Sequence, residues 1–108
     1  MTETSSIHIE RAVLIGISTK TQNEEQTREY LDELEFLALT SGAETVKRFW
    51  QNLPHPDHKT YLGKGKLEEV ANYVANVGVD LVIIDDEISP SQQRNIEKIV
   101  KCKVLDRS

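Results

Sequence analysis

Runs of apolar residues mark four segments that we predict to be β-strands. The first run, Ala12 to Ile15, and the third, Leu81 to Ile84, are apolar at successive positions, which is typical of parallel strands buried on both faces. The four strands are expected over residues 11–17, 43–50, 79–85 and 103–106.

Between these strands the apolar positions recur with helical spacing. Helices are predicted from residue 24 to about 40, from about 66 to 76, and after Ser89, where serine, proline and glutamine form a strong start signal. Gly42 and Gly78 are expected to end the first two helices. Strand and helix alternate, so we predict an α/β fold with a small four-stranded parallel sheet flanked by helices in three layers.

The length of 108 residues fits one domain, which we place at residues 11–108 after a polar, disordered tail at residues 1–10. The single cysteine, Cys102, excludes an internal disulfide and favours a reducing compartment. No apolar run is long enough to cross a bilayer and no secretory signal is recognisable. We therefore expect a cytoplasmic protein without a membrane span.

The net charge of -5 is unevenly distributed. Residues 1–40 contain eight acidic and three basic side chains, whereas residues 41–108 contain ten of each. The acidic total argues against a nucleic-acid binder that acts on its own. It leaves room for a basic face formed by the later residues, because local potential rather than net charge attracts an anion.

The most distinctive polar segment alternates glycine and lysine, at Gly63, Lys64, Gly65 and Lys66, directly before a helix. Free amides at a helix start, together with these lysines and the nearby Lys59, would attract a phosphate or a carboxylate. A simpler interpretation is that the glycines only provide positive φ angles and the lysines are solvated. The spacing matches neither the dinucleotide fingerprint nor the phosphate loop of nucleoside triphosphatases.

A second group of cations, Arg94, Lys98 and Lys101, is predicted to form a stripe on the last helix. This group is a second candidate for phosphate contact, but a solvated helix face, in part neutralised by Glu97, is the preferred interpretation. In a parallel sheet, ligands bind beyond the carboxyl ends of the strands. That edge is expected to gather residues 18–20, 55–66, 85–87 and 106–107.

Other chemistries receive little support. His55 and His58 lack a third fixed ligand, so no metal site is predicted. Asp85 ends a strand as the acceptor of a phosphoryl receiver domain would, but no carboxylate follows the first strand to hold Mg²⁺. No serine hydrolase arrangement is present either. We predict no catalytic residue.

Three blocks of the sequence resemble the N-terminal domain of the HflX-type GTPases. They read TYLGKGKLEE at 60–69, DLVIIDDEISPSQQRNIE at 80–97 and VLDR at 104–107. The resemblance implies a cytoplasmic translation GTPase that binds the large ribosomal subunit, contacts its RNA through this domain and in some members splits stalled ribosomes. It also implies a linker, a GTPase domain, and GTP and Mg in the intact parent.

This chain has no GTP-binding motif, so no cofactor is expected in it and it looks like an excised domain. Two alternatives to RNA binding remain open. The glycine-lysine segment could bind ATP or GTP itself, or it could only dock the GTPase domain of the intact protein.

Overall fold

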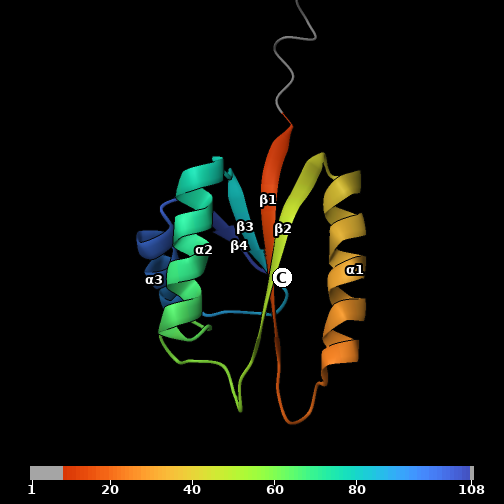
Figure 1. The fold of residues 1–108 in the computed structure, drawn as a ribbon, viewed down its shortest axis with the longest axis vertical. Helices are drawn as coiled ribbons and strands as arrows, with labels where there is room; N and C mark the ends of the chain where they lie inside the picture. Colours follow the sequence, from red (N-terminus) through yellow and green to blue (C-terminus); the bar gives the residue numbers. More distant parts are fainter. Residues whose placement is uncertain (1–8, 108) are drawn as a thin grey trace, which may run out of the picture.

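The structure is a computed structural model that describes residues 9–107, and it contains one parallel sheet of four strands (Figure 1). The strands lie in the order β2-β1-β3-β4. Their bounds are β1 (Glu10–Ser18), β2 (Ala43–Asn52), β3 (Leu81–Ile84) and β4 (Lys103–Leu105). The two most apolar strands, β1 and β3, occupy the middle of the sheet, which confirms the prediction that both of their faces are buried.

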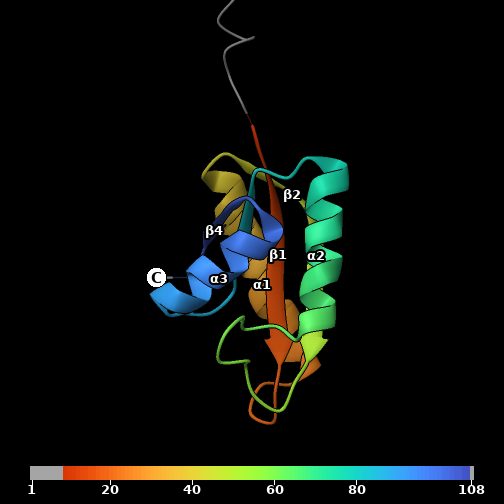
Figure 2. The ribbon, with the colours of Figure 1, turned by 90° about the vertical axis from the view of Figure 1, so that its left-hand side faces the viewer.

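Three helices cover the sheet. Helix α1 (Glu24–Thr40) lies on one face, and α2 (Lys64–Val77) and α3 (Pro90–Val100) lie on the other (Figures 1 and 2). Each face has its own apolar core: Leu31 and Leu34 of α1 pack with Leu14, whereas Leu67 of α2 and Ile96 of α3 belong to the opposite core. The predicted α/β architecture is confirmed.

Local signals at the helix ends are also confirmed. Asn23 and Gln26 form a capping box at α1, and Ser89 and Gln92 form another at α3. Gly78 ends α2 in the left-handed conformation, with φ +80°. These local contacts explain why the starts of α1 and α3 and the end of α2 could be predicted without knowledge of the tertiary fold.

Several predicted bounds need correction. Helix α2 begins at Lys64 rather than Lys66, so Gly65 lies in its first turn. Strand β3 is shorter than predicted and β2 is longer. Glu10 belongs to β1 and not to the tail. Of the other tail residues, Ile9 is exposed and residues 1–8 lie outside the described part.

The idea that Gly63 and Gly65 supply positive φ angles was wrong. Gly63 has φ −63°, and Gly65 is helical. The left-handed residue of this segment is Tyr61, with φ 67°. None of the helices within residues 9–107 combines the length and apolar character that crossing a membrane requires.

Candidate functional site

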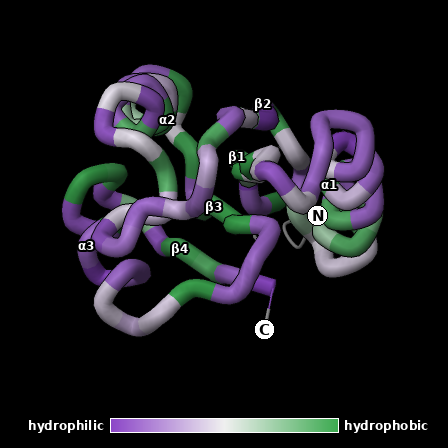
Figure 3. The backbone as a smooth tube through the Cα atoms, turned by 90° about the horizontal axis from the view of Figure 1, so that it is seen from below, coloured by the Kyte–Doolittle hydropathy of each residue, from purple (hydrophilic) through white to green (hydrophobic). Residues whose placement is uncertain are grey.

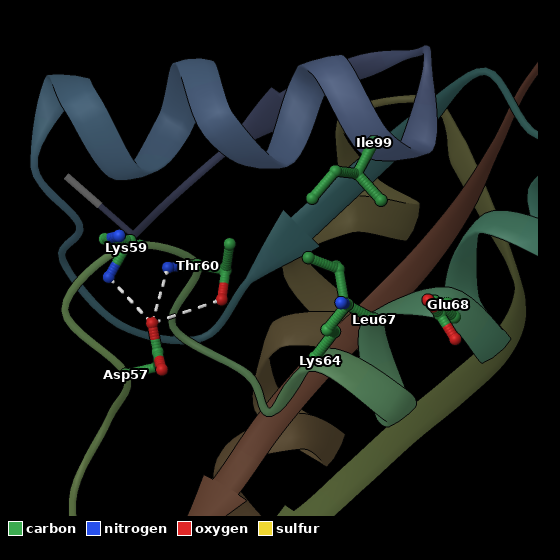
Figure 4. Close-up of a pocket in the computed structure, with 7 residues that line it drawn as sticks. All are labelled: Asp57, Lys59, Thr60, Lys64, Leu67, Glu68 and Ile99. Carbon is green, nitrogen blue, oxygen red and sulfur yellow. Dashed lines mark hydrogen bonds between the residues drawn. The ribbon is translucent and has the colours of Figure 1, made fainter.

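The loop before α2 is shaped by the carboxylate of Asp57. Its Oδ1 accepts hydrogen bonds from the amides of Lys59 and Thr60, at 2.8 and 3.1 Å, and from the Thr60 hydroxyl at 3.3 Å (Figure 4). The two backbone bonds are the main reason that the pKa of Asp57 is lowered. Asp57 and Tyr61 also exchange backbone hydrogen bonds of 3.0 Å in both directions. The loop is therefore closed by its own polar groups.

Helix α3 holds this loop from the side. The Gln92 side-chain amide donates to the carbonyl of Asp57 at 2.8 Å, and the Asn95 side-chain amide donates to the carbonyl of Lys59 at 3.0 Å. Two carbonyls of an irregular segment are thus satisfied by a regular helix. The Lys59 backbone is fixed while its side chain remains exposed.

Tyr61 anchors the loop to the sheet. Its side chain is buried, and its hydroxyl donates to Asp86 Oδ2 at 3.2 Å. Burial, followed by the charge of Asp86, raises the pKa of Tyr61, so the phenol stays protonated at neutral pH. A tyrosine with positive φ is strained, and persists only where its surroundings hold it. The buried ring and its hydrogen bond supply that restraint.

The start of α2 is unusually positive. Gly63 is the N-cap and donates its amide to Gln51 Oε1 at 2.9 Å, but no side chain among residues 9–107 caps the helix. The first turn contains Lys64 and Lys66 and no acidic residue. Helix starts normally favour acids, because the dipole and the unpaired amides are positive there. This arrangement suits an anionic ligand better than it suits the isolated helix.

A hollow of about 400 Å³ lies between the loop, α2 and α3 (Figure 4). Leu67 and Ile99 make part of it apolar, and Lys59 and Lys64 are the cations that line it. Glu68 also lines it and weakens the positive field. The seven lining residues are Asp57, Lys59, Thr60, Lys64, Leu67, Glu68 and Ile99.

The predicted cations separate into different groups. Lys59 and Lys64 share the hollow, whereas Lys66 Nζ lies 3.1 Å from Glu69 Oε1 in an ion pair. Arg94 and Lys98 are exposed on α3. The third member of the predicted stripe, at position 101, is the left-handed C-cap of α3 with φ 59°, so the stripe does not continue along one helix.

The acids at the carboxyl edge of the sheet have structural partners. Asp85 pairs with Arg107 at 2.5 Å, and Asp106 Oδ2 accepts the amide of Ile88 at 3.0 Å. Across residues 9–107, no group of three or more histidine, cysteine, aspartate or glutamate side chains is arranged to hold a metal ion. Of the residues predicted for this edge, Tyr61 contacts Asp86, and Arg107 contacts Asp85 and Asp86. These acids make structural contacts within the domain.

Sequence reasoning did not identify the groups that shape the loop. One signal was present in the sequence. An aspartate whose side chain accepts hydrogen bonds from the backbone amides two and three residues later, as Asp57 does, is a common turn arrangement. The contacts from Gln92 and Asn95 cross more than 30 positions of sequence. No local pattern indicates such pairs.

Comparison with known proteins assigns the family. Residues 28–108 match the sequence model of a family described as GTP-binding GTPase N-terminal. A protein named GTPase HflX from Flavobacterium psychrophilum is 51% identical over the whole chain, which covers 26% of that protein. GTPase HflX of Escherichia coli is 35% identical over 92% of the chain, which covers 22% of its length.

A solved structure has the same fold. The crystal structure of a mutation variant of SsGBP superimposes with a TM-score of 0.64 at 21% identity, covering 90% of this chain and 28% of the other. The chain spans about a quarter of the length of the curated relatives that it matches. The sequence blocks, the family match and the identities agree, and the chain belongs to the family of HflX-type GTPase N-terminal domains.

Proposed function

We propose that this domain is a recognition module of an HflX-like GTPase and that it binds RNA phosphate on the large ribosomal subunit. The observation that carries the proposal is the start of α2, where two lysines occupy a first turn that contains no acid. Beside it, Lys59 projects from a loop that is hydrogen-bonded to α3. Phosphate is the anion that such a helix start favours.

Lys59, Lys64 and the amide of Gly65 are the principal phosphate ligands in this proposal. Lys66 is secondary because it is paired with Glu69. Contacts of this kind position a protein on RNA and make binding depend on salt, but they do not read sequence. A rigid loop suits that role, since little conformational entropy is lost on binding.

In the intact parent, GTP and Mg would bind outside this domain, and the domain itself would have no catalytic role. The chain lacks the G-x-x-x-x-G-K-[ST] motif that cradles nucleotide phosphates. The parent would act on ribosomes in the cytoplasm, with splitting of stalled ribosomes as its outcome. This domain would supply part of the attachment.

Co-sedimentation with purified large ribosomal subunits tests the proposal. Lys59→Ala/Lys64→Ala should reduce the bound fraction severalfold. Lys103→Ala removes the same type of charge from the first residue of β4 and should bind as the unmodified chain does. Lys103 lies at the amino ends of the strands, whereas the loop before α2 follows the carboxyl end of β2. Equal binding by both variants, with unchanged circular dichroism, would reject the proposed site.

Nucleotide binding is the second candidate, and one observation favours it. The hollow beside Lys64 is lined by Leu67 and Ile99, against which a base could pack. Calorimetric titration with ATP and GTP separates the two functions. Saturable binding that Lys64→Ala abolishes would support the nucleotide; binding to subunits without nucleotide binding would support RNA. A chain inert to both ligands would indicate that the loop docks the GTPase domain.

A further inference from the structure

Tyr61 stands between the two lysines of the hollow in a strained conformation. Its φ is 67°, and the amide of Leu62 donates to the carbonyl of Thr60 at 2.6 Å. This hydrogen bond makes Tyr61 the centre of a γ-turn, and the form with positive φ is the rare, strained one. Because Tyr61 lies in the chain between Lys59 and Lys64, relaxing its backbone would move these two cations relative to each other.

Asp86 holds this strained residue from the segment that follows β3. Its Oδ2 accepts the hydroxyl of Tyr61 at 3.2 Å, and its Oδ1 accepts the amide of Glu87 at 2.8 Å. Both carboxylate oxygens thus accept hydrogen bonds inside the domain, and one of them restrains a ring that belongs to the apolar core. The spacing of the two lysines therefore depends on a residue 25 positions after Tyr61.

The same residue also holds the end of the described chain, where the apolar residues of β4 give way to hydrophilic ones (Figure 3). The carbonyl of Asp86 accepts the amide of Arg107 at 3.1 Å. The Arg107 side chain bonds the neighbouring carboxylate, Asp85, and lies 3.7 Å from Glu33 of α1. Asp85 is fixed in turn, because its amide donates to the carbonyl of Ile15 at 2.9 Å. Residues 85 and 86 thus connect the loop before α2 with Arg107.

We propose that Asp86 is a positioning residue that couples the candidate phosphate site to the end of the described chain. While Arg107 is held, Asp86 keeps Tyr61 strained and the two lysines at their present spacing; when Arg107 is released, Tyr61 relaxes and that spacing is lost. Coupling between sites is reciprocal, so an anion that needs both lysines tightens the hold on Arg107. The effect on binding rests on the proposed function, whereas the coupling through Asp86 does not. Any polypeptide that continues from Arg107 thus senses whether the loop is occupied.

Solvent exchange of Arg107, measured by NMR on the 108-residue chain, tests the coupling without RNA. Tyr61→Phe removes only the hydroxyl that bonds Asp86, and the amide and Nε–H of Arg107 should then exchange about threefold faster. Tyr73→Phe, the matched control, removes a phenol hydroxyl that donates to the carbonyl of Val46 at 3.1 Å, and should leave this exchange unchanged. Unchanged exchange in Tyr61→Phe would overturn the proposal. So would equal acceleration in both variants, because a general loss of stability would then explain it.

The opposite direction is tested from the end of the chain. Arg107→Ala should make the amide of Tyr61, which donates to the carbonyl of Asp57 at 3.0 Å, exchange severalfold faster. Arg48→Ala removes an arginine that pairs with two carboxylates of α1, and should leave that amide unchanged. Rates are taken relative to the amide of Val82, a fully buried residue of β3, so that a general loss of stability is recognised. A Tyr61 amide that follows Val82 in both variants would contradict the coupling.

Co-sedimentation with large ribosomal subunits connects the coupling to binding. Tyr61→Phe should lower the affinity severalfold at constant salt, although every lysine is retained, while Tyr73→Phe should bind as the unmodified chain does. Equal affinity of Tyr61→Phe and the unmodified chain would show that the spacing set by Asp86 does not matter for binding, and would overturn that part of the proposal. If the unmodified chain does not bind, the RNA proposal fails, and the two exchange measurements still decide whether Asp86 couples the loop to Arg107.

Discussion

Arg107 donates from Nε to the carboxylate of Asp85 over 2.5 Å, which joins the end of the described chain to the end of β3. The Asp85 side chain is only 1% exposed, whereas that of Arg107 is 40% exposed. Burial raises the pKa of Asp85, and the guanidinium acts in the opposite direction. The pair therefore compensates for a carboxylate that the fold has removed from water.

Removing the cation should destabilise the domain in a pH-dependent way. Arg107→Ala leaves the Asp85 carboxylate buried without its partner, so the free energy of unfolding should fall by about 2 kcal/mol near neutral pH. This loss is smaller than that expected for a fully buried pair, because Arg107 is partly exposed. The folded pKa of Asp85 is raised, so the folded state holds the proton more tightly than the unfolded state does. Arg107→Ala also removes the guanidinium that lowers the pKa of Asp85, so this pKa should rise further in the variant. The loss should therefore shrink as the pH falls from the pKa of Asp85 in the variant towards that in the unmodified chain.

Urea denaturation at neutral and mildly acidic pH measures this effect. Asp85→Asn/Arg107→Ala, which has no buried charge at this position, should show a smaller dependence on pH than Arg107→Ala. A constant difference between Arg107→Ala and the unmodified chain at all pH values would contradict the account.

The hydrogen bonds of Asp57 should stabilise the loop. Asp57→Ala removes the acceptor for the amides of Lys59 and Thr60 and should cost about 1 kcal/mol, as loss of a helix cap does. The folded pKa of Asp57 is lowered, so this stabilisation is complete above its ordinary value of 3.8 and is lost as the pH falls through the lower folded value.

Asp57→Asn keeps an acceptor oxygen but does not titrate. Denaturation of the three proteins between neutral and strongly acidic pH should show the Asn variant losing less stability on acidification than the unmodified chain. Parallel pH profiles for all three would show that the carboxylate does not stabilise the loop.

Gly65→Ala separates stability from binding. Gly65 is helical, and an added Cβ would meet no atom of the described residues within 4 Å, so alanine should stabilise the domain by roughly 0.5 kcal/mol. If a phosphate approaches the Gly65 amide, the methyl group should nevertheless weaken binding to large subunits. Thermal denaturation and co-sedimentation of the same variant measure the two effects. Higher stability with unchanged binding would place the phosphate elsewhere.

The fold could be predicted because its signals are local. The capping boxes at Asn23 and Ser89 and the apolar strands β1 and β3 depend on neighbours in sequence. The start of α2 was misplaced because Gly63 and Gly65 indicated a turn, whereas the strained residue is Tyr61. Its positive φ is maintained by burial and by Asp86, which lies 25 positions away.

The candidate site was only partly predictable, because some of its contacts join residues that are distant in sequence. The charges of Lys59, Lys64 and Lys66 are visible in the sequence, and Glu69 stands three residues after Lys66, a helical spacing that allows their ion pair. Only the structure shows that Lys64 lines a hollow together with Lys59. The lysines of this motif thus differ in their surroundings, Lys66 through a local pair and Lys64 through the packing of α2 beside the loop and α3.

The salt dependence of binding to large ribosomal subunits tests the central claim most directly. Each phosphate contact contributes roughly one unit to the slope of log affinity against log salt concentration. Lys59→Ala/Lys64→Ala should lower that slope by about two, while Lys103→Ala leaves it unchanged. Identical slopes for the unmodified chain and both variants would contradict the claim that this loop binds RNA phosphate.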